Sequence, residues 1–93
     1  MIRGFRDGAT ERLFRRERGS KLARSLQRAT LRKLLLLDAA ESLDDLRVPP
    51  GNRLEKLAGD RKGQYSIRVN DQYRVCFRWD GGEAHAVELV DYH

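Results

Sequence analysis

The sequence has few of the residues that build covalent or metal-based sites. It contains one cysteine, Cys76, and two histidines, so it can form no internal disulfide and offers too few ligands for a zinc site. No apolar run approaches the roughly 20 residues that a membrane-spanning helix needs. Near the amino terminus Arg3 and Arg6 flank Phe5, which excludes the apolar centre of a signal peptide. We therefore expect a cytoplasmic protein with no metal, no cofactor and no membrane attachment.

Length and charge indicate the number of domains and the kind of partner. The 93 residues suffice for one small domain, which we expect to span residues 1–93. The net charge of +5 is unevenly distributed. Residues 1–33 carry eleven Lys or Arg against three acids, a balance of +8, whereas residues 48–93 carry seven of each sign. Such a basic segment indicates a polyanion or an acidic protein as partner, and a solvated helix face is the alternative.

Two stretches in the last third alternate with the period of a β-strand. One apolar face holds Tyr65, Ile67, Val69, Tyr73, Val75, Phe77 and Trp79. The opposite face carries arginines, so we expect one side of the sheet to pack on a core and the other to be open. The Asp80-Gly81-Gly82 turn and the apolar residues 87–90 predict one more strand. A short strand near residues 54–57 follows a rigid loop, Val48-Pro49-Pro50-Gly51-Asn52.

The connection between the two alternating strands determines which side chains meet. A three-residue loop, Asn70-Asp71-Gln72, keeps the two faces sorted and sets Arg68 directly opposite Arg74. Like charges opposite one another are unfavourable, so we expect an anion between them, either Asp91 or a phosphate. For the same reason, replacing either arginine should leave folding little changed or improved.

The amino-terminal half predicts a short strand at residues 2–5 and a two-helix hairpin. Asp7 can cap a helix that runs to about Arg16, and Ser20 can cap a second helix that runs to about Ala40. The expected core face of the second helix consists of Leu22, Leu26, Ala29, Leu36, Leu37 and Ala40. A separate basic ridge consists of Lys21, Arg24, Arg28 and Arg32. The predicted fold is α+β, with a short strand and two helices packed on a curved, mostly antiparallel sheet.

The chain ends in Asp91-Tyr92-His93, and these residue types can support acid–base chemistry. Histidine transfers protons near neutral pH, tyrosine donates a proton or a hydrogen bond, and two arginines can stabilise a pentavalent phosphate. This combination is typical of a metal-free ribonuclease that uses the substrate's own 2′-OH as nucleophile. Either His93 or Tyr92 can act as the acid.

These motifs together resemble the HigB-type toxins of the RelE/ParE toxin superfamily. The resemblance is detailed from about Leu46 to His93: the Pro-Pro-Gly-Asn loop, the stretch Tyr-Ser-Ile-Arg-Val-Asn-Asp-Gln-Tyr-Arg and the terminal Asp-Tyr-His occur in order. It implies a RelE-like fold and a ribosome-dependent mRNA endonuclease that blocks translation. It also implies a helix-turn-helix antitoxin as partner, with operator DNA bound only through the antitoxin complex.

The resemblance also assigns site residues. Arg68, Arg74, Asp91, Tyr92 and His93 match the active-site set of the family, and Arg53 and Lys56 match positions that face RNA. We count Arg78, Arg24, Arg28 and Arg32 as further RNA contacts. Where many members carry a histidine near the Pro-Pro loop, this sequence has Asn52-Arg53. Two alternatives remain open: a ParE-like inhibitor of DNA gyrase, and a non-catalytic nucleic-acid-binding module of a toxin–antitoxin complex.

Overall fold

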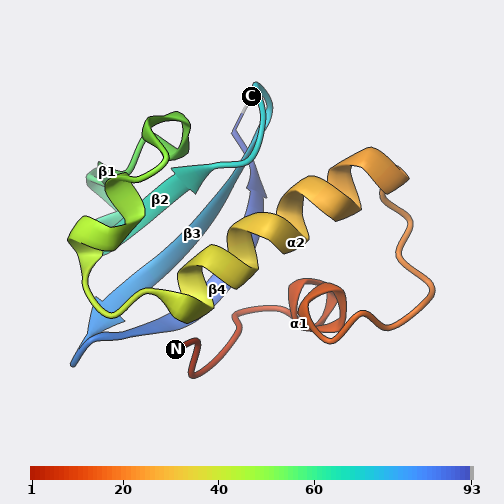
Figure 1. Ribbon diagram of the computed structural model, residues 1–93, viewed down its shortest axis with the longest axis horizontal. Coiled ribbons are helices and arrows are strands. Elements are labelled where there is room, and N and C mark those ends of the chain that lie inside the picture. The colour runs from red at the N-terminus through yellow and green to blue at the C-terminus, as the bar shows by residue number, and fades with distance from the viewer. Residues whose placement is uncertain (93) are drawn as a thin grey trace.

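The computed structural model describes residues 1–92, in which two α-helices pack against one four-stranded sheet (Figure 1). Three short 3-10 helices, Leu43–Arg47, Pro50–Asn52 and Gly59–Arg61, lie in the connections within this range. The α-helices are α1 (Gly8–Phe14) and α2 (Arg24–Ala39). The strands are β1 (Glu55–Lys56), β2 (Gln64–Arg68), β3 (Tyr73–Asp80) and β4 (Glu83–Asp91). They pair antiparallel in the order β1-β2-β3-β4, so each strand lies beside its neighbour in the chain. The predicted α+β class and the successive strands are confirmed.

The expected first strand is present only as two isolated bridges. Ile2 pairs with Ala84 and Phe5 with Val87, both parallel to β4. The backbone N–H groups of Arg3 and Arg6 donate to the carbonyls of Ala84 and Val87 at 2.8 and 2.9 Å. The amino-terminal segment therefore occupies the free edge of β4.

The α1 helix begins as the sequence predicts. The carboxylate of Asp7 accepts a hydrogen bond from the Thr10 N–H at 3.2 Å, which satisfies one of the donors that a helix start leaves unpaired. The helix ends at Phe14, about half a turn earlier than expected.

The start of α2 was predicted wrongly, whereas its buried face was predicted in large part: Leu37 and Ala40 are buried, and Leu26 and Ala29 pack against the core as expected. The helix begins at Arg24, and Ser20 instead accepts a hydrogen bond from the Leu22 N–H within the connecting loop. Leu34 and Leu37 are fully buried, whereas Leu36, which was expected in the core, is 38% exposed. Leu22, also expected on this face, precedes the helix.

The main core lies between α2 and one face of the sheet (Figure 1). Ile67, Val75, Phe77 and Val87 contribute the sheet side and are fully buried. Their alternation along the strands matches the apolar face read from the sequence. Burial of these side chains supplies most of the stabilisation that holds the helix layer on the sheet.

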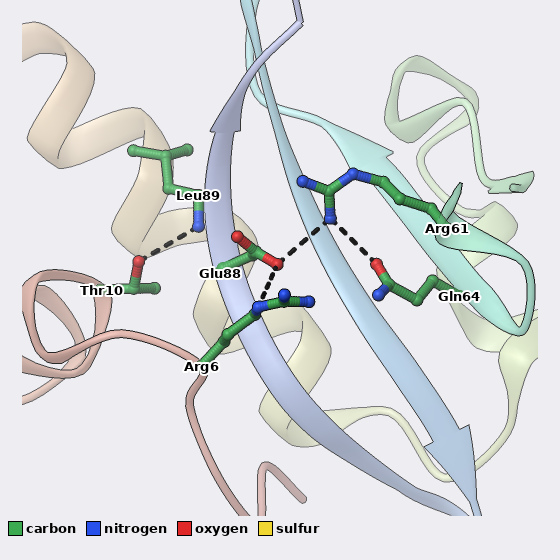
Figure 2. A network of polar contacts seen from close by, with 6 residues as sticks. All are labelled: Arg6, Thr10, Arg61, Gln64, Glu88 and Leu89. Carbon is green, nitrogen blue, oxygen red and sulfur yellow. Dashed lines mark hydrogen bonds and ion pairs between the residues drawn. The ribbon is translucent and has the colours of Figure 1, made fainter. Parts of the chain in front are cut away.

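The opposite face of the sheet is partly covered and not fully open, which corrects the prediction: Arg78 on it is exposed, but its centre is not. Ser66 and Cys76 lie on it and are fully buried. Figure 2 shows the polar network beside them: Glu88 on β4 accepts from Arg61 at 3.1 Å and pairs with Arg6 at 3.5 Å. Arg61 also donates to Gln64 at 3.1 Å. The loop before β2 and the amino-terminal segment are thereby tied to β4.

None of the helices in residues 1–92 is long and apolar enough to cross a membrane.

Candidate functional site

The two arginines face each other as the sequence predicts. Arg68 on β2 pairs in register with Arg74 on β3, so both side chains leave the same side of the sheet. The connecting loop is the expected three-residue turn, closed by the Val69 N–H donating to the Tyr73 carbonyl at 2.9 Å. The Asn70 side-chain oxygen accepts from the backbone N–H groups of Gln72 and Tyr73, both at 2.8 Å, which fixes the turn.

Arg74 is held rigidly and is largely buried. Its residue exposure is 8%, and its guanidinium donates to Ser66 Oγ at 2.7 Å and to the Arg53 carbonyl at 2.5 Å. A longer ion pair joins it to Glu55 at 3.8 Å. These contacts indicate a stabilising role for Arg74, in contrast to the expectation that its replacement would leave folding little changed or improved. A cation fixed in this way is preorganised for a charge that develops beside it.

Arg68 is more loosely held than Arg74. Its side chain is 33% exposed and pairs with Asp71, whose own side chain is 98% exposed. The carboxylate paired with Arg68 thus comes from the turn rather than from Asp91. An ion pair with so exposed a partner is weak, so a phosphate can displace Asp71 at little cost.

The carboxyl-terminal residues divide between the two faces. Asp91 lies opposite Tyr73, on the helix side of the sheet, and accepts from the Gln72 side chain at 3.0 Å. Tyr92 follows on the other side, where the guanidinium carbon of Arg74 lies 5.8 Å from its ring centroid. Tyr92 is 45% exposed. The structure brings Tyr92 to the arginine pair; His93 lies outside the described residues.

The predicted RNA-facing residues are spread more widely. Arg53 is exposed, in a left-handed conformation with φ of 44°, and its carbonyl accepts from Arg74. Lys56 lies opposite Tyr65 in register, so it leaves the sheet on the side away from Arg74. Arg78 shares the side of Arg74 but lies four residues further along β3, about 13 Å away.

The ridge residues Lys21, Arg24, Arg28 and Arg32 are exposed on the helix layer. They lie on the helix layer, whereas the side chains of Arg68 and Arg74 leave the other side of the sheet. This position fits contact with a large partner rather than with a small ligand between the two arginines.

One cation near the site was not singled out from the sequence. Lys33 of α2 is half-buried, and its ammonium group donates to Asn52 Oδ1 at 2.5 Å. Partial burial lowers the pKa of Lys33 from its ordinary value, and the charges of Arg32 and Arg68 lower it further. The sequence gives no distinguishing signal, because Lys33 lies in a leucine-rich helix between the basic ridge and the core.

Within residues 1–92 no cluster of three or more His, Cys, Asp or Glu side chains is arranged to hold a metal ion.

Comparisons with known proteins agree on one family. Residues 3–93 match the model of the HigB-like toxin family, described as the RelE-like toxin of the type II toxin–antitoxin system HigB. A protein from Vibrio cholerae named Toxin HigB-1 is 47% identical over 85 residues, which cover 90% of each chain. A protein from Proteus vulgaris named Endoribonuclease HigB is 31% identical over 94 residues, covering all of both chains.

A solved structure supports the fold. The YoeB-YefM complex from Staphylococcus aureus contains a chain that superposes with a TM-score of 0.62 at 18% identity, covering all of this chain and 98% of that one. At this identity the likeness concerns the architecture of two helices on an antiparallel sheet.

Proposed function

The chain belongs to the HigB-like toxins, the RelE-like toxins of type II toxin–antitoxin systems, and from this premise we propose that it is an endoribonuclease that cleaves messenger RNA on the ribosome and so blocks translation. The relative from Proteus vulgaris that carries the name endoribonuclease aligns over the full length. The same family membership supports an antitoxin as partner and action in the cytoplasm.

The observation that carries the proposal is the pairing of Arg68 with Arg74 beside Tyr92. Two guanidinium groups on opposed strand positions can contact both non-bridging oxygens of one phosphodiester. Arg74 is fixed by hydrogen bonds. Arg68 is paired with the exposed carboxylate of Asp71, which the substrate phosphate can replace. Charge that accumulates on the phosphate in the transition state is thereby stabilised by preset donors.

The remaining residues of the site supply proton transfer and positioning. The 2′-OH attacks the phosphorus, the bond from phosphorus to the 5′-oxygen breaks, and a general acid gives its proton to that leaving oxygen. We assign this acid to His93. Tyr92, whose ring lies beside Arg74, is the proposed base: as a phenolate it accepts the proton of the 2′-OH. Asp91, which already accepts from Gln72, orients the end of β4.

Variants on programmed ribosomes test these roles under single-turnover conditions. His93→Gln should slow cleavage on the order of 10²-fold or more, as loss of a general acid does. If His93→Gln cleaved normally while Tyr92→Phe did not, the acid would be Tyr92. Arg3→Ala is the matched control, because Arg3 pairs with Glu83 at the far end of β4, about 26 Å from Asp91. It should cleave like the unmodified chain.

The proposal fails if the folded chain leaves messenger RNA on ribosomes intact. Inhibition of DNA supercoiling by gyrase in the same preparation would then favour the gyrase-directed branch of the superfamily. If a His93→Gln, Tyr92→Phe double variant no longer cleaved RNA but still inhibited translation in full, the non-catalytic module would be favoured.

The basic ridge is the proposed binding surface for the ribosome. Reversing the charges of Arg24, Arg28 and Arg32 should weaken ribosome association at low salt, where such contacts are strongest, and leave the chemical step unchanged once the complex has formed. Association that is unchanged at low salt would identify the ridge as a solvated face.

A further inference from the structure

Lys33 differs from the other cations of α2 in where its ammonium group lies. Arg28 and Arg32 are exposed, whereas Lys33 is half-buried beside the fully buried Leu34. Its Nζ donates to Asn52 Oδ1 at 2.5 Å, across 19 residues of sequence. The side chain is therefore directed from the helix toward the Pro-Pro-Gly-Asn loop and not into solvent.

The acceptor of Lys33 is itself rigid. Asn52 is fully buried, and its amide nitrogen donates to the Leu46 carbonyl at 3.1 Å and to the Val48 carbonyl at 3.3 Å. With the amide nitrogen fixed in this way, the side-chain oxygen is left to accept from Lys33. The residue after Asn52 is Arg53, whose carbonyl accepts from Arg74, so the same loop contacts both Lys33 and one arginine of the site.

The charges around Lys33 are of its own sign. Its electrostatic neighbours are Arg32 and Arg68, and no carboxylate pairs with it in the part of the chain that the structure describes. Its hydrogen bond to Asn52 occupies one of three ammonium N–H donors. A partly buried ammonium group beside other cations is unfavourable unless an anion joins them.

We propose that Lys33 binds a backbone phosphate of the RNA strand beside the phosphate held by Arg68 and Arg74. The proposal rests on the ribonuclease function proposed above. Arg68 is the common neighbour: it faces Arg74 across the hairpin and lies within electrostatic reach of Lys33. The ligand is a phosphodiester of single-stranded RNA, and Asn52 acts as the positioning residue that aims the ammonium group.

Binding measured without cleavage tests this proposal separately from the enzyme activity. The probe is a fluorescent, single-stranded 2′-O-methyl RNA, which binds but lacks the attacking hydroxyl. Lys33→Gln should weaken binding and lower the slope of log affinity against log salt by about 0.7, the loss of one phosphate contact. Lys33→Arg should restore the slope. Lys62→Gln removes an exposed lysine of the turn before β2 and is the matched control.

An unchanged salt slope in Lys33→Gln overturns the proposal, whether or not the chain cleaves RNA. Should Lys33→Gln fail to fold after losing its bond to Asn52, the unmodified chain provides the second measurement. The side-chain nitrogen signal of Lys33, identified by its absence from the Lys33→Arg spectrum, should shift when the 2′-O-methyl RNA is added. A signal that stays fixed at saturating RNA shows a structural lysine only.

Discussion

The two opposed arginines should differ sharply in what they contribute to stability. Arg74→Ala removes charge-assisted hydrogen bonds to Ser66 Oγ and to the Arg53 carbonyl and leaves the fully buried Ser66 with a lost partner. Such bonds contribute ~1.5–3 kcal/mol each, and relaxation recovers part of the loss. We expect the free energy of unfolding to fall by about 2–4 kcal/mol. Arg68→Ala removes only a pair with a side chain that is 98% exposed, which contributes about 0–1 kcal/mol.

Urea unfolding followed by the fluorescence of Trp79, the single tryptophan, measures both differences. Arg74→Lys serves as an intermediate variant, because it keeps the charge but cannot reach two acceptors in the same fork. Equal destabilisation by Arg74→Ala and Arg68→Ala, or a loss below about 1 kcal/mol for Arg74→Ala, would contradict the reasoning. It would mean that the hydrogen bonds of Arg74 merely offset the cost of burying its charge.

The core, the cysteine and one capping residue give further predictions. Leu34→Ala should cost about 2–5 kcal/mol in urea unfolding, and Leu36→Ala, at a position 38% exposed, less than about 1 kcal/mol. Burial raises the pKa of the Cys76 thiol, so a disulfide reagent should modify the chain only as fast as it unfolds, and rapid labelling of the native chain would contradict this. Hydrogen bonds from the backbone of residues 41 and 42 lower the pKa of Asp45 below its ordinary 3.8, so they stabilise the fold above that pH and the contribution is lost as the pH falls. The melting temperatures of Asp45→Asn and of the unmodified chain should therefore converge in acid.

The sequence predicted the parts of the site that local geometry determines. Strand parity together with a three-residue turn is enough to place Arg68 opposite Arg74, because side chains alternate with a period of two and opposed residues share a face. The cap at Asp7 was equally predictable, since one side chain and one backbone N–H make it.

The predictions that were wrong concern features that depend on how segments distant in the sequence pack together. Residues 34–37 are four consecutive leucines, so the sequence does not determine which side of the helix faces the core. Packing against the sheet buries Leu34 and leaves Leu36 exposed. The cover over Ser66 and Cys76 comes from Arg61, which reaches across β2 and β3 to Glu88. The residues around Arg61 and Glu88 in the sequence do not indicate that these two side chains meet.

The pairing of residues 2 and 5 with residues 84 and 87 bears on how the chain is made. Synthesis proceeds from the amino terminus, so the first segment must wait for the last strand before either finds its partner. The contact between Tyr92 and Arg74 likewise forms only after β4 has left the ribosome exit tunnel. Stalled nascent chains should therefore remain sensitive to protease until the stall site lies well beyond residue 91.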